Sequence, residues 1–253
     1  MAEIKKFIAD DEHPLSFLRE FTQARIAISS AGNGIPTKNA LEFKLAHAHA
    51  RDAVYSVMDT ERLYDELIGF NLPVLPLHSQ ATTREQYLQR PDLGRLPDET
   101  SMNRLADQVQ NNGIVFIVAD GLSAAAVNEN AVPLLQVVIP QLIAAKHKVG
   151  HICLVEQGRV AIADHIGAEL GASLSVILIG ERPGLSAADS MSAYLTFNPK
   201  PGLKDDARNC ISNIRTQGLP IAAAATKLFY LIQEAFSLKL SGVGLKDNEQ
   251  LLG

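Results

Sequence analysis

Three short runs of apolar, largely β-branched residues constrain this chain most strongly, at residues 113–118, 152–155 and 174–179. Continuous runs of this kind are typical of parallel strands that are buried on both faces. Helical stretches alternate with them, which gives a β-α-β-α-β order with right-handed crossovers. The helices predicted between and after the strands cover about 130–146, 160–170 and 220–239. The sequence therefore predicts an α/β fold with an open, mostly parallel, Rossmann-like sheet and flanking helices.

The first hundred residues differ from the rest and predict a helical N-terminal region. Apolar residues recur at helical spacing from Thr37, a candidate N-cap, to about Val57. Residues 71–100 contain four prolines and predict a long connection with short helices, of the kind that wraps a partner. We accordingly divide the chain into an N-terminal arm and helical region, residues 1–100, and an α/β domain, residues 101–253.

Composition excludes several classes of protein. The 253 residues are 47% hydrophobic and 20% charged, which is typical of a globular chain with a large apolar core. A net charge of −5 and the absence of Trp argue against nucleic acid as a partner. Cys153 and Cys210 are too few for a disulfide framework, and no apolar run reaches the ~18 residues of a membrane span. We expect a cytoplasmic protein without a signal peptide or a membrane contact.

Polar residues follow each of the three predicted strands. Asp120 and Ser123 come after the first, Glu156 and Gln157 after the second, and Glu181 and Arg182 after the third. Ligands of open parallel sheets bind outside the carboxyl ends of the strands. The same residue types also serve as turn residues and helix caps, so a binding edge and ordinary βα turns are both compatible with this pattern.

Hydrolytic and metal chemistry receive little support. The segment Gly121–Ala125 resembles a nucleophile elbow around Ser123, but the last histidine, His165, lies in a predicted helix next to Asp164. An α/β serine hydrolase is therefore a minor alternative. His47 and His49 are two residues apart on a helix and point to different faces, so we predict no metal site.

Seven runs together resemble one family, the small (light) subunit of ethanolamine ammonia-lyase. They lie in the family's order along the chain: Thr22–Ile26, His47–Val54, Val118–Ala124, Gln157–Ala161, Ile179–Leu185, Arg208–Arg215 and Leu240–Val243. The resemblance implies a carbon–nitrogen lyase that converts ethanolamine to acetaldehyde and ammonia by a radical route. It also implies that adenosylcobalamin, with its cobalt, is held at the interface with a larger TIM-barrel subunit, in a higher-order hetero-oligomer.

The family's cofactor contacts fall on Val160, Glu181 and Cys210 of this chain. Substrate-binding side chains are implied to belong mainly to the larger subunit, so no catalytic residue is assigned here. Because the Asp-x-His-x-x-Gly pattern is missing, we predict base-on binding, in which the cofactor keeps its own axial nitrogen. A noncatalytic binding partner with the same fold is the alternative function.

The chain departs from some family members at its N-terminus. About twenty residues precede the Thr22 run, where those members carry an amphipathic helix associated with a bacterial microcompartment. Ile4, Phe7 and Ile8 form only a small apolar face, followed by acidic residues. We therefore expect the cytoplasm, with encapsulation in a bacterial microcompartment as the alternative.

Overall fold

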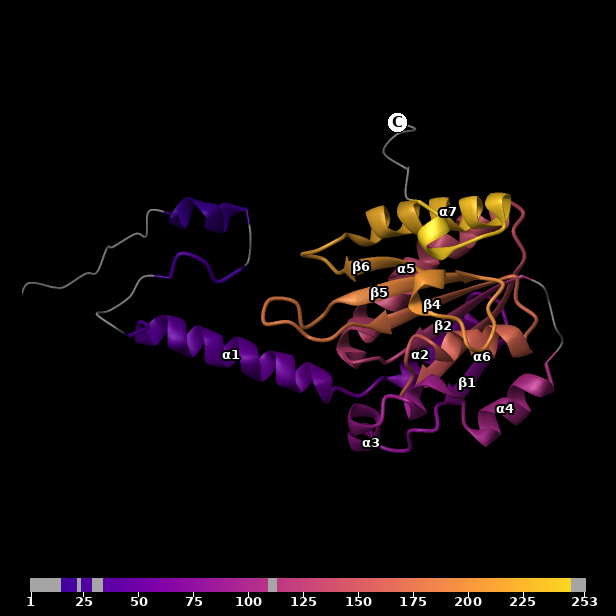
Figure 1. Ribbon diagram of the computed structural model, residues 1–253, viewed down its shortest axis with the longest axis horizontal. Helices are drawn as coiled ribbons and strands as arrows, with labels where there is room; N and C mark the ends of the chain where they lie inside the picture. The colour runs from indigo at the N-terminus through magenta and orange to yellow at the C-terminus, as the bar shows by residue number, and fades with distance from the viewer. Residues whose placement is uncertain (1–14, 22–23, 29–33, 109–112, 247–253) are drawn as a thin grey trace, which may run out of the picture.

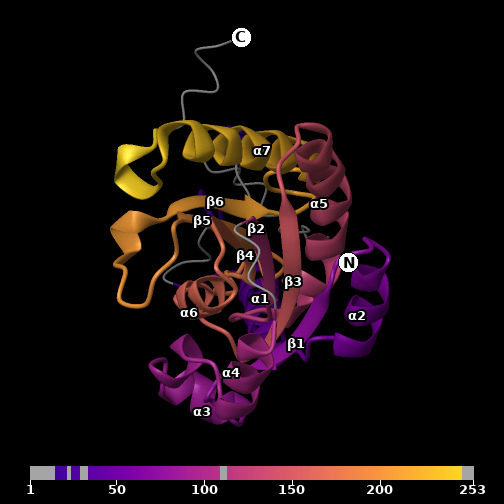
Figure 2. The same ribbon diagram turned by 90° about the vertical axis from the view of Figure 1, so that its right-hand side faces the viewer.

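A six-stranded mixed sheet forms the centre of the molecule (Figures 1 and 2). The computed structural model describes residues 15–21, 24–28, 34–108 and 113–246. The strands lie in the order β1-β3-β2-β4-β5-β6; the first four are parallel, and β5 and β6 each run antiparallel to the preceding strand. Their bounds are β1 Val74–His78, β2 Ile114–Ala119, β3 Val149–Glu156, β4 Leu174–Gly180, β5 Met191–Phe197 and β6 Asn209–Ile214.

Helices cover both faces of this sheet (Figure 2). One apolar core lies under α2, α5 and α7, and the other lies under α4 and α6. The α-helices are α1 Thr37–Val54, α2 Thr60–Ile68, α3 Arg84–Gln89, α4 Glu99–Ala106, α5 Ala124–Ala144, α6 Ile162–Glu169 and α7 Ile221–Leu238. Short 3₁₀ helices lie at Ser16–Glu20, Leu93–Arg95, Asp205–Ala207 and Gly242–Gly244.

Strand β2 explains why the sheet is covered on both sides. Its side chains alternate between the two cores, with Phe116 and Val118 in one and Val115 and Ile117 in the other. All of these side chains are fully buried. A strand between two helical layers is more stable when every side chain is apolar, because both of its faces are buried. The sequence of β2 is apolar at every position.

The predicted α/β class is confirmed, and the sheet is larger than predicted. The three predicted strands are β2, β3 and β4, and the predicted helices correspond to α1, α5, α6 and α7. The sequence did not predict β1 or the antiparallel strands β5 and β6. Helix α5 begins earlier than expected, because Ser123 caps it directly after the β2 turn. The Rossmann-like description stays a prediction.

The proline-containing segment 71–100 contains short helices, as the sequence predicted, and it also packs on this chain's own sheet. Strand β1 lies within it and pairs with β3. Tyr87 of α3 is fully buried, and its hydroxyl donates to the carbonyl oxygen of Gly158 at 3.0 Å. The division at residue 100 stays a prediction, although β1 joins the sheet built from residues after it.

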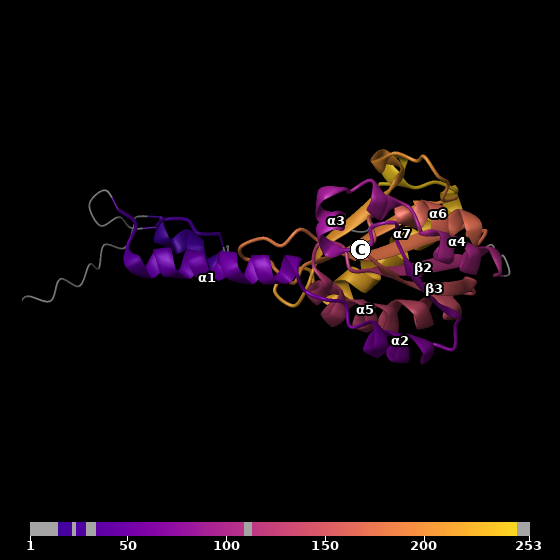
Figure 3. The same cartoon turned by 90° about the horizontal axis from the view of Figure 1, so that it is seen from below.

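Helix α1 extends away from the sheet and from the helices that cover it (Figures 1 and 3). Ala53, in its last turn, is its only buried residue. Leu41, Phe43 and Leu45 are 60%, 47% and 58% exposed. The helix leaves the body from the side to which the β4–β5 connection also projects, beyond the carboxyl end of β4 (Figure 1). Within the described part of the chain, no helix is both long and apolar enough to span a bilayer.

Candidate functional site

Two of the predicted site residues line one cavity at the carboxyl edge of the sheet. Val160 comes from the turn between β3 and α6, and Glu181 follows the last residue of β4. The cavity has a volume of about 400 Å³, and Leu122, Ile179 and Tyr194 supply much of its apolar lining. Turns after β2, β3 and β4 converge there, because parallel strands present their carboxyl ends on the same edge.

The carboxylate of Glu181 is fixed by three hydrogen bonds. Its Oε1 accepts from the hydroxyl of Ser192 and, at 2.8 Å, from the backbone N–H of Asn213. Its Oε2 accepts from the hydroxyl of Ser190 at 2.8 Å. Ser192 lies in β5, Ser190 directly precedes β5, and Asn213 lies in β6. The sequence predicted Glu181 as a site residue, but it did not predict the two strands that supply these hydrogen-bond donors. The charged form of Glu181 is thereby held in one orientation beside the cavity.

Cys210 lies next to this cavity and not in its wall. It pairs across β5 and β6 with Tyr194, and its Sγ is 3.9 Å from Oγ of Ser192, which also binds Glu181. Partial burial raises the pKa of the Cys210 thiol, which therefore stays protonated near neutral pH. The flanking Arg208 and Arg215 pair with Asp164 and Asp189. Cys210 is thus suited to a packing or hydrogen-bonding contact and not to nucleophilic catalysis.

A buried ion pair stabilises the turn after β2, next to this cavity. Asp120 follows β2 and is 4% exposed, and Arg84 Nη1 lies 3.5 Å from its Oδ2. Burial raises the pKa of Asp120 to about 6, against the opposing effects of Arg84 and of backbone N–H groups that include Gly158. The sequence singled out Asp120 but missed Arg84, because no local pattern in the short helix α3 indicates that its first residue pairs with a carboxylate after β2.

Tyr87 and Arg159 complete the support and were also missed. The Arg159 guanidinium stacks over the Tyr87 ring, 4.1 Å from its centroid, and Arg159 Nη2 donates to the Tyr87 carbonyl oxygen at 3.0 Å. Burial raises the pKa of Tyr87, so its hydroxyl remains a donor to Gly158. Arg159 precedes Val160 in the chain, and its fixed position fixes the Val160 backbone.

The remaining strand-end residues have different surroundings. Ser123 is fully buried; its hydroxyl donates to the Ala188 carbonyl oxygen at 2.8 Å and accepts from the Ala126 N–H at 3.3 Å. It is therefore the N-cap of α5, which argues against the hydrolase alternative. Arg182 lines the cavity with Glu181. Glu156 lies outside it.

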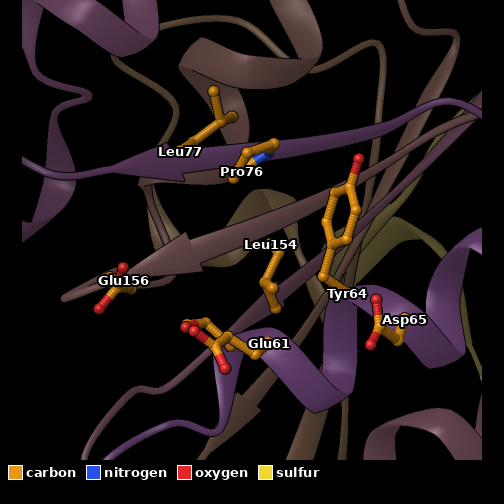
Figure 4. A pocket seen from close by; sticks show the side chains of 8 residues that line it. Glu61, Tyr64, Asp65, Pro76, Leu77, Leu154 and Glu156 are labelled. Atoms are coloured by element: carbon orange, nitrogen blue, oxygen red, sulfur yellow. The ribbon is translucent and has the colours of Figure 1, made fainter.

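Glu156 instead lines a separate cavity of about 520 Å³ between α2 and the β1 edge (Figure 4). Glu61, Tyr64 and Asp65 of α2 face it across an apolar floor that includes Leu154. None of Val160, Glu181 and Cys210 lines this cavity. Of the polar residues after the three predicted strands, Glu181 and Arg182 therefore line one cavity and Glu156 lines the other. The predicted site residues lie at the Glu181 cavity.

Comparison with known proteins identifies the family. Residues 12–246 match the family model described as ethanolamine ammonia-lyase light chain. This chain belongs to that family. It is 50% identical over 244 residues to the ethanolamine ammonia-lyase small subunit of Azotobacter vinelandii, covering 95% of this chain and 90% of that one. It is 50% identical over 240 residues to the Ralstonia nicotianae small subunit, covering 93% and 89% of the two chains.

A Pseudomonas aeruginosa protein of the same name is 47% identical over 247 residues, covering 96% of this chain and 90% of that one. The resemblance inferred from seven short runs is thus confirmed along almost the whole chain. The contacts of Val160, Glu181 and Cys210 with a cofactor stay predictions of the family assignment.

Proposed function

We propose that this chain is the small subunit of an adenosylcobalamin-dependent ethanolamine ammonia-lyase, which converts ethanolamine to acetaldehyde and ammonia. The proposal rests on membership of the light chain family and on relatives at about 50% identity that bear the small-subunit name. The observation that carries it is the gathering of Val160, Glu181 and Cys210 around one cavity at the sheet edge.

The side chains present fit a corrinoid. Such a cofactor is a flat macrocycle with amide side chains, so it needs apolar walls and well-placed hydrogen-bond acceptors. Val160 and Tyr194 supply apolar surface. Among the described residues, Oε2 of Glu181 accepts one hydrogen bond, from Ser190, and so retains capacity to accept an amide N–H.

When bound, adenosylcobalamin supplies the radical chemistry through homolysis of its cobalt–carbon bond. The residues of this chain bind and orient. Val160 would pack against the cofactor, Glu181 would accept hydrogen bonds from its amides, and Cys210 would make a packing contact beside it. Base-on binding, which the missing Asp-x-His-x-x-Gly pattern predicts, is part of this proposal. A cobalt EPR spectrum split by a protein imidazole would contradict that mode.

Helix α1 supports a role as one part of a hetero-oligomer. It exposes Leu41, Phe43 and Leu45 on a helix that buries almost nothing against its own chain. Apolar side chains on a projecting helix are a typical protein interaction surface. We assign this helix to the contact with the larger TIM-barrel subunit, and the two kinds of subunit form a higher-order hetero-oligomer. The larger subunit supplies the substrate-binding side chains.

We place the assembly in the cytoplasm, with a bacterial microcompartment as the alternative. The apolar face at Ile4, Phe7 and Ile8, on which an address would depend, lies outside the described residues. Fractionation of native cells that grow on ethanolamine would separate the two locations.

Coexpression with the larger subunit tests the function directly. We expect the two chains to copurify, to bind adenosylcobalamin, and to release acetaldehyde and ammonia from ethanolamine only when both chains and the cofactor are present. A stable complex that binds the cofactor without turnover would favour the noncatalytic alternative. Failure of the two chains to associate would contradict the proposal.

A further inference from the structure

A second cavity lies directly beyond Val160 and has a different charge. Its volume is about 590 Å³, and it shares Arg159, Val160 and Tyr194 with the Glu181 cavity. Four cationic side chains line it, and a single carboxylate does so. They are Arg95, Arg159, Lys204 and Arg208, with Asp205 as the carboxylate. This concentration of positive charge stands out in a chain whose net charge is −5.

One of these cations is already neutralised. Arg208 pairs with Asp164, and both side chains are only 2% exposed. Arg208 Nη1 also lies 3.1 Å from Oδ1 of Asp205, which consumes the lining carboxylate. Arg208 therefore anchors the turn that carries Lys204, whose carbonyl oxygen accepts from Arg208 Nη1 at 2.7 Å. It is part of the wall and not a free charge.

The other three cations lack such compensation. In the part of the chain that the structure describes, no carboxylate lies within ion-pair distance of Arg95, Arg159 or Lys204. Arg159 is held by Tyr87, and its buried Nε has no partner among the described residues. Like charges around one cavity repel each other, so an anion placed between them is favoured.

We propose that this second cavity binds the phosphodiester in the nucleotide tail of adenosylcobalamin. The inference rests on the proposed function, which places the corrin against Val160 and Glu181. A ligand that carries amides on its ring and an anion on its tail meets an acceptor in the first cavity and cations in the second. Arg159 stands at the boundary of the two cavities, and Arg95 and Lys204 reach the anion from the outer side.

The test compares corrinoids that differ only in the tail, using the complex of both subunits. Adenosylcobalamin carries the phosphodiester and the base, adenosylcobinamide phosphate carries a phosphate without the base, and adenosylcobinamide carries neither. Arg95 and Lys204 are exposed, so the double variant Arg95→Gln/Lys204→Gln should fold normally. Dissociation constants are measured from the absorbance of the bound corrinoid, and assembly is measured by sedimentation velocity.

We expect the double variant to bind adenosylcobalamin and adenosylcobinamide phosphate about tenfold more weakly, with a shallower dependence on salt. Its affinity for adenosylcobinamide should match that of the unmodified complex. The control is Lys148→Gln, an exposed lysine next to the amino end of β3, which should leave all three constants unchanged.

Equal changes for all three corrinoids, or no change for any, would overturn the phosphate site while leaving the proposed function standing. Weaker association of the two subunits in the double variant would also overturn it, because the cavity would then receive an acidic group of the larger subunit. If the unmodified complex binds none of the corrinoids, the proposed function itself fails and the phosphate site fails with it.

Discussion

Arg84 Nη1 lies 3.5 Å from Asp120 Oδ2, and this ion pair joins segments that are far apart in the sequence. The same guanidinium donates to the carbonyl oxygen of Val54 at 2.8 Å and to that of Gly121 at 2.9 Å. It also reaches Oε1 of Gln157 at 3.3 Å. The end of α1 and the turns after β2 and β3 are thus tied to one side chain beneath the Glu181 cavity.

Replacing Arg84 by Met should lower the free energy of unfolding by about 3 kcal/mol, because Asp120 is left buried without its cation. Urea denaturation of the full chain at pH 7 measures the loss. The matched control is Arg90→Met, which removes an exposed ion pair with Asp92 and should have no measurable effect. Equal losses in the two variants would show that Arg84 does not hold the edge together.

Asp120 should also make stability depend on pH between about 4 and 6. Its pKa is about 6 in the folded chain, and an unfolded aspartate titrates near its ordinary value of about 4. The folded state therefore binds the proton more tightly, so this stabilisation is present below about pH 4 and is lost as the pH rises through 6.

The variant Asp120→Asn lacks this titration. The free energy of unfolding of the unmodified chain, minus that of the variant, should fall by about 2–3 kcal/mol from pH 4 to pH 7. Parallel urea denaturation series at several pH values give this difference, in which the other titrating groups cancel. A difference that stays constant with pH would mean that Asp120 is ionised throughout.

The sequence was informative where burial alone decides the structure. Strands β2, β3 and β4 are apolar at nearly every position because they lie between two helical layers. Strand β1 was missed because it contains Pro76, which is tolerated at the sheet edge, where β1 pairs only with β3. Strand β6, also at an edge, includes the exposed Ser212 and Asn213 and has no continuous apolar run.

In the candidate site, too, only residues next to a buried strand could be predicted from the sequence. Glu181 was predictable because it directly follows β4. Its hydrogen-bond partners were not predictable, because they lie in or next to the two unpredicted strands: Ser190, Ser192 and Asn213. Arg84 reaches Asp120 across 36 positions of sequence, and no local pattern encodes a pairing of that kind. Side chains that depend on tertiary pairing therefore require the structure.

The variant Glu181→Gln removes the charge of this side chain but should keep its position. The oxygen of the introduced amide retains the Ser192 and Asn213 bonds, and its NH₂ group donates to Ser190, whose hydroxyl turns to accept. Folding and subunit association should therefore persist. Loss of the charge-assisted contact should weaken adenosylcobalamin binding to the complex by about 1.5–3 kcal/mol, measured by absorbance titration.

The control for this variant is Glu156→Gln, the same change at the neighbouring strand end but in the separate cavity of Figure 4. Its cofactor affinity should equal that of the unmodified complex. If Glu181→Gln also binds the cofactor normally, Glu181 serves only to join β4 to β5 and β6.

Gly180 is required by a close approach of two turns. A Cβ at this position would lie 2.0 Å from the carbonyl oxygen of Ser123 and 2.7 Å from that of Asp120. Gly180→Ala must therefore push the end of β4 away from the β2–α5 turn, and the free energy of unfolding should fall by about 3 kcal/mol. In Gly184→Ala, no described atom lies closer than 3.9 Å to the new Cβ, so thermal unfolding should be unchanged. Similar melting temperatures for the two variants would contradict this packing.

The exposed face of α1 gives the last prediction. Leu41 and Leu45 are four residues apart, so they lie on the same side of the helix, and we expect them to contact the larger subunit together. Because both are exposed in the isolated chain, Leu41→Asp/Leu45→Asp should leave its free energy of unfolding unchanged. Burial of two leucines at an interface is worth about 3–6 kcal/mol, so association with the larger subunit should weaken by at least about a hundredfold.

Val243→Asp is the control for this pair, because Val243 is 79% exposed and follows α7 in the 3₁₀ helix Gly242–Gly244. Sedimentation velocity of mixtures with the larger subunit measures association for both variants. Unimpaired association of the α1 variant would assign the contact to another surface. Equal weakening by Val243→Asp would instead indicate that added negative charge, and not the loss of apolar contact on α1, opposes association.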